Sequence, residues 1–463
     1  MTASSAAATS IDSDIIFERK IKLATEGLFK RYFKLLSKLQ PKQNAIAIAD
    51  FIISLNTEIN PSTNHKMAAI EALQMLSKRH HIDKSFKDMV RDDIISFLDT
   101  VRKSEASDPL HKWVGTYNHY RMFIVQFFRW LYYLDIEPKK RPKPAVVENI
   151  PQLKRKEQSI YKPTDLWTTS DDLLFLKYCP SKRIKCYHMI ARDLSARPHE
   201  ILRLKVRDAV FKSIVGRQYA EVTVNGKTGT RTIPLIQSIP YLKDYLSNEH
   251  TQPGNPNAPL ICGTSKSIGR PISTRALFNI YKTYKGQIFP KLLQSSTVVP
   301  EDKPLILELL KKPWNPYVVG RHTSLTQKSK ILKEPVLRAH AGWSQRSNMH
   351  LKYLHYFGNE SSESLLQEYG IIPKDEFTDD LLLLKPKQCP NCSELNQKDS
   401  RFCAKCRMVL TYDAYNETVE EKRDKDREVE SLKEQMLSMQ EAQKEILDLL
   451  KDPAKLLEVL KDN

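Results

Sequence analysis

Apolar residues recur every three or four positions along the first part of the chain. This spacing predicts amphipathic helices from residue 14 to a stop signal at Asn60-Pro61, and again from Asn64 to Asp135. The end of this stretch, residues 120–131, is apolar on nearly every side, which is typical of a buried helix. The pattern predicts an N-terminal helical bundle over residues 14–136, after a flexible tail over residues 1–13.

The helical pattern gives way to a basic, proline-rich stretch over residues 137–164. Pro138, Pro142, Pro144 and Pro151 interrupt any regular element, and lysines and arginines stand between them. We interpret this stretch as an extended basic linker between two folded units. A merely solvated spacer is the alternative interpretation.

Residues 165–375 return to helical periodicity with one interruption. Two runs of strand-like residues, 219–224 and 230–235, flank the sequence Asn225-Gly226-Lys227-Thr228-Gly229, in which glycine supplies the turn. This arrangement predicts a β-hairpin inside a mainly helical domain. The expected fold class is therefore mainly α with a small antiparallel β-sheet.

The C-terminal residues 413–463 are predicted to form a charged helix. Alternating steps of three and four separate its apolar residues and include one polar residue, as in a short heptad seam. The seam consists of Val429, Leu432, Met436, Met439, Gln443, Ile446 and Leu450, and Asp452-Pro453 closes it. About three heptads are marginal for an isolated coiled coil, so packing against the chain's own body is an alternative.

Length, composition and charge narrow the class of protein. A chain of 463 residues is long enough for two or three folded units, and its 41% hydrophobic content excludes a mostly disordered protein. The net charge of +18 favours a polyanionic partner and makes the linker a candidate strap along DNA phosphates. Ribosome-associated and membrane-surface proteins share this charge balance.

The sequence shows no sign of membrane insertion. No apolar run reaches the roughly 18 residues that a spanning helix needs. The first residues, Met1 to Thr9, are small and uncharged, without the basic flank and hydrophobic stretch of a secretory signal. We therefore expect a cytoplasmic protein with no membrane partner.

Four of the seven cysteines form two C-x-x-C pairs, Cys389 with Cys392 and Cys403 with Cys406, across a ten-residue spacer. Four thiolates at this spacing are typical of tetrahedral zinc, whereas the remaining cysteines lie too far apart to indicate a disulfide framework. Such a site has no open position for a catalytic water. Residues 376–412 are therefore predicted to be a zinc ribbon with structural zinc, the alternative being redox-active or unmetallated thiols.

The segment from Leu194 to Leu204 has the features of a helix start. Ser195 is a candidate N-cap and Pro198 fits the first turn, so Arg197 is expected at the positive end of a helix. A guanidinium at that end is suited to gripping a phosphate, because it can donate two hydrogen bonds and the helix dipole adds to its charge.

Further segments follow Arg197 in a definite order. Lys227 stands on the hairpin turn, and Arg321 lies in Asn315-Pro316-Tyr317-Val318-Val319-Gly320-Arg321-His322-Thr323. Trp343 follows in Ala341-Gly342-Trp343, and Tyr353 in Lys352-Tyr353-Leu354-His355. With this ordered set, over about residues 64–370, the chain resembles the tyrosine recombinases (integrases). It is most similar to archaeal integrases, which often also end in a Cys-rich module.

The resemblance implies a fold and a chemistry. The helical bundle would be a core-binding (SAM-like) DNA-clamp domain, and residues 165–375 the tyrosine recombinase catalytic domain. Tyr353 would attack a DNA phosphate, form a 3'-phosphotyrosyl bond and release a 5'-hydroxyl, so catalysis would need neither ATP nor metal. Arg197 and Arg321 would stabilise the transition state, and Lys227 would protonate the leaving oxygen.

Three other residues take supporting or rival roles through the same resemblance. Glu200 matches the acidic residue of the family that orients the first arginine. Trp343 stands where the family has His or Trp, and its indole N–H could donate to a phosphate oxygen without shuttling protons. Tyr356 is a rival nucleophile, but the Tyr-Leu-His context favours Tyr353.

The sequence departs from the family pattern just before Arg321. Val318 stands where the family usually has His or Lys, and Gly320 looks like a one-residue insertion that displaces Tyr317. The general base is therefore open: Tyr317 is the first candidate, and His322 and His340 are the imidazoles near enough in sequence to replace it.

Three hypotheses of function follow. The first is a nucleoid-associated site-specific recombinase that integrates or excises a mobile element, acting on double-stranded DNA attachment sites as a synaptic oligomer. The second, motivated by Val318 and Gly320, is a recombinase fold that has lost catalysis and serves as a DNA-binding or regulatory protein. The third, a transcription or RNA-binding factor, leaves Tyr353 and the ordered basic residues unexplained.

Overall fold

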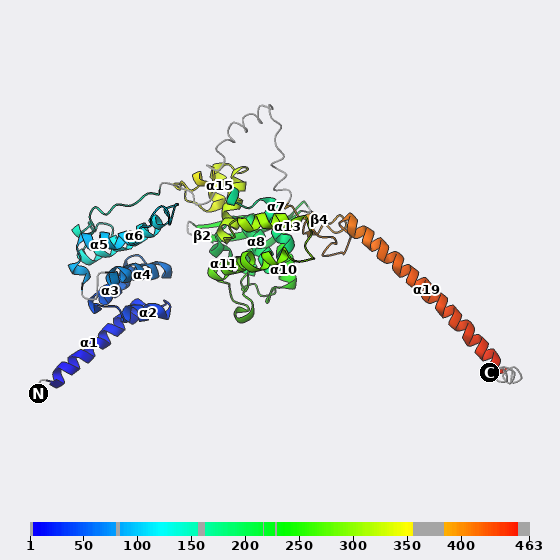
Figure 1. Cartoon of the computed structure of the whole chain (residues 1–463), viewed down its shortest axis with the longest axis horizontal. Coiled ribbons are helices and arrows are strands. Elements are labelled where there is room, and N and C mark those ends of the chain that lie inside the picture. Colours follow the sequence, from blue (N-terminus) through cyan, green and yellow to red (C-terminus); the bar gives the residue numbers. More distant parts are fainter. Residues whose placement is uncertain are drawn as a thin grey trace, which may run out of the picture. The chain divides into compact units, whose positions relative to one another are not determined.

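A computed structural model describes residues 3–79, 84–155, 163–215, 217–226, 229–354 and 384–451 of the chain. The chain divides into two compact units, Met1–Ile160 and Tyr161–Asn463, whose elements are labelled in Figure 1. The described residues are mainly helical with small antiparallel sheets, as predicted. Among them, no helix has the length and apolar character that crossing a membrane requires.

The first unit is a helical bundle built around α6. Phe127 of α6 lies at its centre, with ring centroids 5.4 Å from Phe51 and 4.8 Å from Phe86. One side of α6 reaches the surface, because Met122 and Tyr132 are 45% and 46% exposed. The prediction of a helix buried on nearly every side was therefore wrong for this face. The elements are α1 (Ala3–Ala24), α2 (Lys30–Ser37), α3 (Lys42–Glu58), α4 (Thr63–Arg79), η1 (Phe86–Asp88), α5 (Arg91–Asp99), α6 (Trp113–Tyr132) and η2 (Ala145–Val147).

The proline-rich segment after α6 is irregular but anchored to this bundle. The Arg141 guanidinium donates to both carboxylate oxygens of Glu58, at 3.0 and 2.7 Å, and is buried. Val147 and Ile150 are buried in the same hydrophobic core. The prediction of an extended linker therefore fails for its described first part, because apolar burial and a buried ion pair hold it against the bundle.

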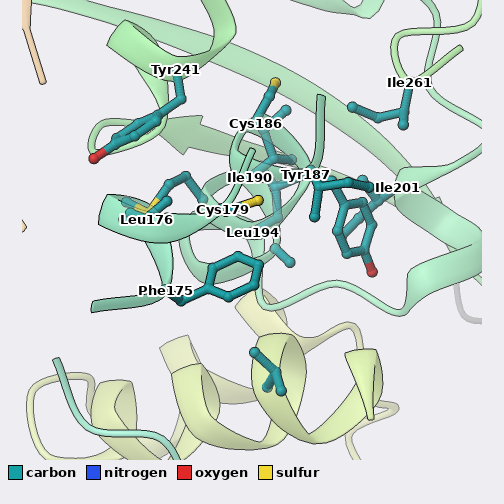
Figure 2. Close-up of a cluster of buried hydrophobic side chains, with 14 of the residues drawn as sticks. Phe175, Leu176, Cys179, Cys186, Tyr187, Ile190, Leu194, Ile201, Tyr241 and Ile261 are labelled. Carbon is teal, nitrogen blue, oxygen red and sulfur yellow. The ribbon is translucent and has the colours of Figure 1, made fainter. Parts of the chain in front are cut away.

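The core of the second unit surrounds α8. Figure 2 shows side chains of α7, α8, α9 and α10 gathered in this core, among them Phe175, Tyr187 and Ile190. A buried polar network crosses it, in which Asp172 of α7 lies 2.8 Å from His188 and 2.6 Å from Arg192 of α8. The first elements of this unit are η3 (Pro163–Asp165), α7 (Thr169–Tyr178), α8 (Lys182–Leu194), α9 (Pro198–Ile201) and η4 (Val206–Asp208).

A three-stranded antiparallel sheet follows, in the order β1 (Ala209–Ile214), β2 (Arg217–Gly226) and β3 (Gly229–Leu235). The predicted hairpin is confirmed, with Val222 opposite Ile233 and Asn225 opposite Thr230. The strand β1 was not predicted. Its side chains are exposed at nearly every position, so it lacks the alternation that marks a half-buried strand.

The remaining described elements of the second unit are helical apart from the C-terminal β4 and β5. Two of its turns, η6 and η7, are π-helical. These elements are α10 (Ile239–Asn248), η5 (Ser265–Ser267), α11 (Thr274–Thr283), η6 (Tyr284–Ile288), α12 (Phe289–Leu292), α13 (Asp302–Lys311), η7 (Tyr317–His322), α14 (Thr323–Ser329), α15 (Glu334–Ala341), α16 (Leu351–Leu354), β4 (Lys387–Gln388), β5 (Leu395–Asn396) and α19 (Tyr412–Lys451).

The π turn η7 explains the unusual sequence before Arg321. A π-helical turn holds one residue more than an α-helical turn, so it accommodates the insertion that Gly320 suggested. Gly320 also lies against α8, where a Cβ atom would come within 2.8 Å of the Ala191 Cβ. Only glycine allows this approach, and the contact holds the turn that carries Arg321 against the core.

We expect Gly320→Ala to lower the free energy of unfolding by about 1–3 kcal/mol, because its methyl group overpacks the contact with Ala191. Gly286→Ala is the matched control, since Gly286 lies in the other π turn with open space around it. Adding Ala191→Gly to Gly320→Ala should recover part of the loss. Urea denaturation measures all four proteins, and equal losses at Gly320 and Gly286 would contradict the packing argument.

Candidate functional site

The candidate site begins where α8 ends and α9 starts. Ser195 is not the N-cap of α9 as predicted: it ends α8 in a left-handed conformation (φ 50°). Arg197 is the N-cap instead, with Pro198 in the first turn as expected. The Arg197 Nη1 donates to Glu200 Oε1 at 2.8 Å, and its backbone N–H donates to Oε2 at 3.0 Å. Glu200 therefore fixes both the backbone and the side chain of Arg197.

Glu200 is buried between two arginines. Its Oε2 also accepts a hydrogen bond from Arg231 Nη2 at 2.8 Å, and the residue is only 2% exposed. Burial would raise the pKa of this carboxyl, but Arg231 and Arg197 outweigh it and lower the pKa to about 2. Glu200 is thus a charged carboxylate at neutral pH, shared by both guanidiniums.

Arg231, on β3, was missed in the sequence. Its Nε donates to the His340 carbonyl at 2.9 Å, so it joins the sheet, Glu200 and the end of α15. Two glycines leave space for the Arg231 guanidinium. A Cβ on Gly226 would lie 2.9 Å from Arg231 Nη1, and a Cβ on Gly342 would lie 2.6 Å from it. The available signal was an arginine on the strand that follows a basic hairpin turn, two residues after Gly229.

Arg321 lies deep in the same cluster and is 2% exposed. It donates to the carbonyls of Ser195 and Ala341, both at 2.8 Å, and its guanidinium lies 5.8 Å from the Trp343 ring centroid. Among the described residues it forms no ion pair. Burial, followed by repulsion from Arg197, lowers the pKa of Arg321. The site therefore holds a desolvated positive charge.

Tyr353, on α16, packs within this cluster and is 2% exposed. Its ring stacks between Trp343 and His322, with centroids 5.3 and 5.6 Å away. The Tyr353 hydroxyl lies 3.0 Å from His322 Nδ1, within hydrogen-bond distance. Trp343 also lies 5.8 Å from the Arg321 guanidinium, so its ring links Tyr353 to Arg321.

The three candidate bases take different places. His322 contacts the Tyr353 hydroxyl, and the Tyr317 ring lies 5.2 Å from the His322 ring. His340 Nε2 lies 3.1 Å from Ser195 Oγ. Burial and then the charge of Lys328 lower the pKa of His340 to about 3, so this imidazole is neutral at neutral pH. Val318 is fully buried.

Lys328 of α14 is a second residue that the sequence did not reveal. Its ammonium donates to the carbonyls of Arg192 and Asp193, both at 2.7 Å, and to Ser195 Oγ at 3.0 Å. Burial lowers the pKa of Lys328 to about 8. These bonds satisfy the last carbonyls of α8 and hold the turn that leads to Arg197.

Two predicted residues lie outside the described part of the chain. Lys227 falls between β2 and β3, and Tyr356 follows α16. Gly226, the last described residue before Lys227, lies against Glu200 and Arg231, since a Cβ there would come within 2.8 Å of Glu200 Oε1. The strand β2 therefore ends at the site.

The four C-terminal cysteines form a separate cluster. Their sulfurs all lie within 4.8 Å of one another, with Cys389 Sγ 3.5 Å from Cys406 Sγ and Cys392 Sγ 3.6 Å from Cys403 Sγ. Zinc–sulfur bonds of about 2.3 Å in a tetrahedron place sulfurs roughly 3.8 Å apart, so this donor set fits a structural zinc ion.

Both C-x-x-C turns have the same backbone geometry. Ser393 and Arg407, the residues after each turn, are left-handed with φ of 58° and 60°. Their backbone N–H groups donate to the carbonyls of Cys389 and Cys403 at 2.9 and 3.0 Å. Although burial opposes it, donation from the backbone N–H groups of Cys406 and Lys405 lowers the pKa of Cys403 to about 6, which favours a thiolate ligand.

The cysteine module is attached to the second unit through α10. Lys243 pairs with Glu394, and Gln397 donates to Asp244 at 3.3 Å. Leu395 of β5 packs against the main hydrophobic core of the unit. A metal that orders this module would therefore also order its contact with α10.

Comparisons with known proteins give likenesses of structure at low identity. No protein-family model matches the chain, and no curated protein matches its sequence. The chain is similar to XerH site-specific recombinase bound to palindromic difH substrate in a post-cleavage complex (TM-score 0.46, 15% identity, 76% of this chain and 95% of that chain). It is also similar to a lambda integrase dimer bound to a COC' core site (TM-score 0.44, 12% identity, 66% of this chain and 94% of that chain). A third similar structure is the Tn1549 transposon integrase in complex with transposon right end DNA (TM-score 0.44, 12% identity, 70% of this chain and 98% of that chain).

The pKa of Glu200 leads to a prediction for stability. A carboxyl whose pKa is about 2 when folded and about 4.3 when unfolded contributes ~3 kcal/mol above the unfolded pKa. This contribution is lost as the pH falls through the folded pKa. We expect Glu200→Gln to be strongly destabilised at pH 7. The difference in free energy of unfolding between the parent and this variant should shrink as the pH falls from about 5 to about 2.

Urea unfolding at several pH values measures this gap. Glu308→Gln is the matched control, because Glu308 makes a surface ion pair with Lys311, with both side chains at least 66% exposed. The difference in free energy of unfolding between Glu308→Gln and the parent should stay near zero at every pH. A Glu200→Gln gap that does not change with pH would contradict the charged carboxylate.

The cysteine cluster predicts bound metal. Protein expressed with ample zinc should contain about one zinc per chain, and a chelator should remove it together with the protection of the module from proteolysis. Replacing Cys392 and Cys403 with serine should abolish zinc binding, measured by elemental analysis. Cys179→Ala is the control, since Cys179 is a buried thiol outside the cluster. Absence of zinc from the parent, or its retention in the double variant, would contradict the assignment.

Proposed function

We propose that this chain is a tyrosine site-specific recombinase that cuts and rejoins DNA strands through a 3'-phosphotyrosyl intermediate on Tyr353. The observation that carries the proposal is the contact of the Tyr353 hydroxyl with His322, in a cluster where Trp343 stacks on Tyr353 and lies 5.8 Å from the buried guanidinium of Arg321. A nucleophile, an imidazole and an uncompensated cation are what attack on a phosphodiester requires.

The charge of the site supports a phosphate ligand. Glu200 is held by Arg197 and Arg231, whereas Arg321 is buried with only neutral partners among the described residues. Burying such a charge is costly, and a phosphate would offset that cost. In the transition state the non-bridging oxygens gain negative charge, so Arg197 and Arg321 would bind it more tightly than the ground state.

His322 is proposed as the proton acceptor for Tyr353. In the attack, Tyr353 Oη bonds to phosphorus, its proton passes to His322 Nδ1, and the bond from phosphorus to the 5'-oxygen breaks. The contact of 3.0 Å supports His322 over Tyr317, which was the first candidate from the sequence. Tyr317 would then contact the phosphate beside Arg197 rather than take the proton. Burial lowers the pKa of Arg197, but Glu200 and, to a smaller extent, Tyr317 raise it, so Tyr317 is close to that guanidinium.

Lys227 is proposed as the acid that protonates the leaving 5'-oxygen. Its position after Gly226, which lies against Glu200 and Arg231, supports this role. A 5'-hydroxyl of a second strand would reverse the reaction and rejoin DNA, so no ATP or catalytic metal would be consumed. Double-stranded DNA as partner is supported by the net charge of +18. Integration or excision of a mobile element, by a synaptic oligomer, is the setting we propose.

A covalent-adduct assay tests the proposal. The purified chain is incubated with nicked duplex fragments of its source genome, and SDS-resistant protein–DNA adducts are collected and their DNA sequenced. We expect an adduct on one sequence class, with DNA linked to the peptide that contains Tyr353. Tyr353→Phe should abolish it, whereas Tyr356→Phe should retain it.

The remaining variants separate the roles. His322→Gln should slow adduct formation by about 10²–10⁴-fold, and Tyr317→Phe much less. Arg321→Lys should slow it by about 10²–10³-fold with DNA binding kept. Sequence-specific DNA binding without any adduct would favour the second function, a recombinase fold that has lost catalysis. An adduct that persists in Tyr353→Phe would place the nucleophile elsewhere.

A further inference from the structure

The apolar positions of α19 are exposed. Val429, Leu432, Met436, Met439 and Ile446 are 48%, 54%, 61%, 65% and 56% exposed. Together with Gln443, which is also exposed, they are called the α19 seam. Every described side chain from residue 420 to residue 447 is exposed, so the described part of the second unit leaves the seam uncovered.

The seam has the spacing of a two-stranded coiled coil. Val429, Met436 and Gln443 occupy one core position of the heptad, and Leu432, Met439 and Ile446 occupy the other. Because α19 is a single helix, these residues form one stripe along it. A continuous apolar stripe is costly to leave in water, so it marks a contact surface.

The charges beside the seam favour a second copy in parallel orientation. Glu428 and Lys433 flank the core at the positions that face each other across a parallel pair, five residues apart. Glu428 of each copy would therefore meet Lys433 of the other. Among the described residues, Lys433 makes a loose contact of 3.7 Å with Glu430 in its own helix and is 65% exposed, so it can turn toward a partner.

The one polar core residue points to the same orientation. In a parallel pair in register, Gln443 of one copy lies opposite Gln443 of the other, and the two amides can hydrogen-bond. In an antiparallel pair the two types of core position face each other, so an amide would lie against an apolar side chain and lose its partner.

We infer that α19 pairs with α19 of a second copy of this chain as a parallel, in-register, two-stranded coiled coil along the α19 seam. The pair forms without DNA and does not depend on the proposed strand-exchange chemistry. Since the described seam spans fewer than three heptads and contains two methionines, the pair is weak, with a dissociation constant on the order of micromolar.

Sedimentation of the DNA-free, zinc-loaded full chain tests the pair, from about 1 to about 100 µM. We expect a monomer–dimer equilibrium that Leu432→Gln weakens by about tenfold or more. Leu437→Gln is the matched control, because Leu437 is a leucine on the same helix, 59% exposed and outside the seam. Circular dichroism checks that both variants keep the helix. A monomer at every concentration, equal effects of the two variants, or a stoichiometry above two overturns the inference.

Charge reversal tests the orientation. Glu428→Lys and Lys433→Glu should each weaken the homodimer, because each brings like charges together twice. An equal mixture of the two variants should form heterodimers in which both pairs are again attractive. Homodimers of the variants as stable as the parent, or a mixture that forms no heterodimers, overturn the parallel arrangement.

Discussion

The candidate site depends on one buried carboxylate. Glu200 accepts hydrogen bonds from the side chains of Arg197 and Arg231, and these bonds join the start of α9 to the strand β3. Arg231 extends the link to the end of α15 through the His340 carbonyl. An unpartnered carboxylate would be costly at this depth, so the three segments must stay together for the charge to remain compensated.

The same interaction sets the charge of the site. One carboxylate serves Arg197 and Arg231, which leaves the positive charge of Arg321 without an anionic partner among the described residues. Arg321 is nonetheless fixed, because two backbone carbonyls hold it. A rigid, desolvated guanidinium is already oriented for an anion, so under the proposed function little free energy would be spent on ordering Arg321 when a phosphate binds.

Local patterns, within one element or between neighbours in the sequence, were predictable, whereas contacts between distant elements were not. The hairpin followed from strand-like runs around a glycine turn, and the zinc-type cysteine cluster from two C-x-x-C pairs. The cap of α9 was placed wrongly, because Ser195 has a favourable cap side chain but lies in the left-handed end of α8. Arg231 and Lys328 were missed since neither belongs to a local motif; each gains its place only when distant elements pack.

The π turn η7 shows how the site can tolerate its unusual sequence. In an ordinary α-helix, the residue three positions before Arg321 would lie on the same side of the helix as Arg321. In the wider π turn, Tyr317, four positions before Arg321, still contacts His322. Val318 is then free to be buried as an apolar side chain. Under the proposed function, the hydrophobic Val318 would be a consequence of the π turn rather than a lost catalytic group, and Tyr317 and His322 would supply the polar side of the turn. The π turn packs against Ala191 through Gly320. It changes which residues face the site, while Arg321 stays in the core.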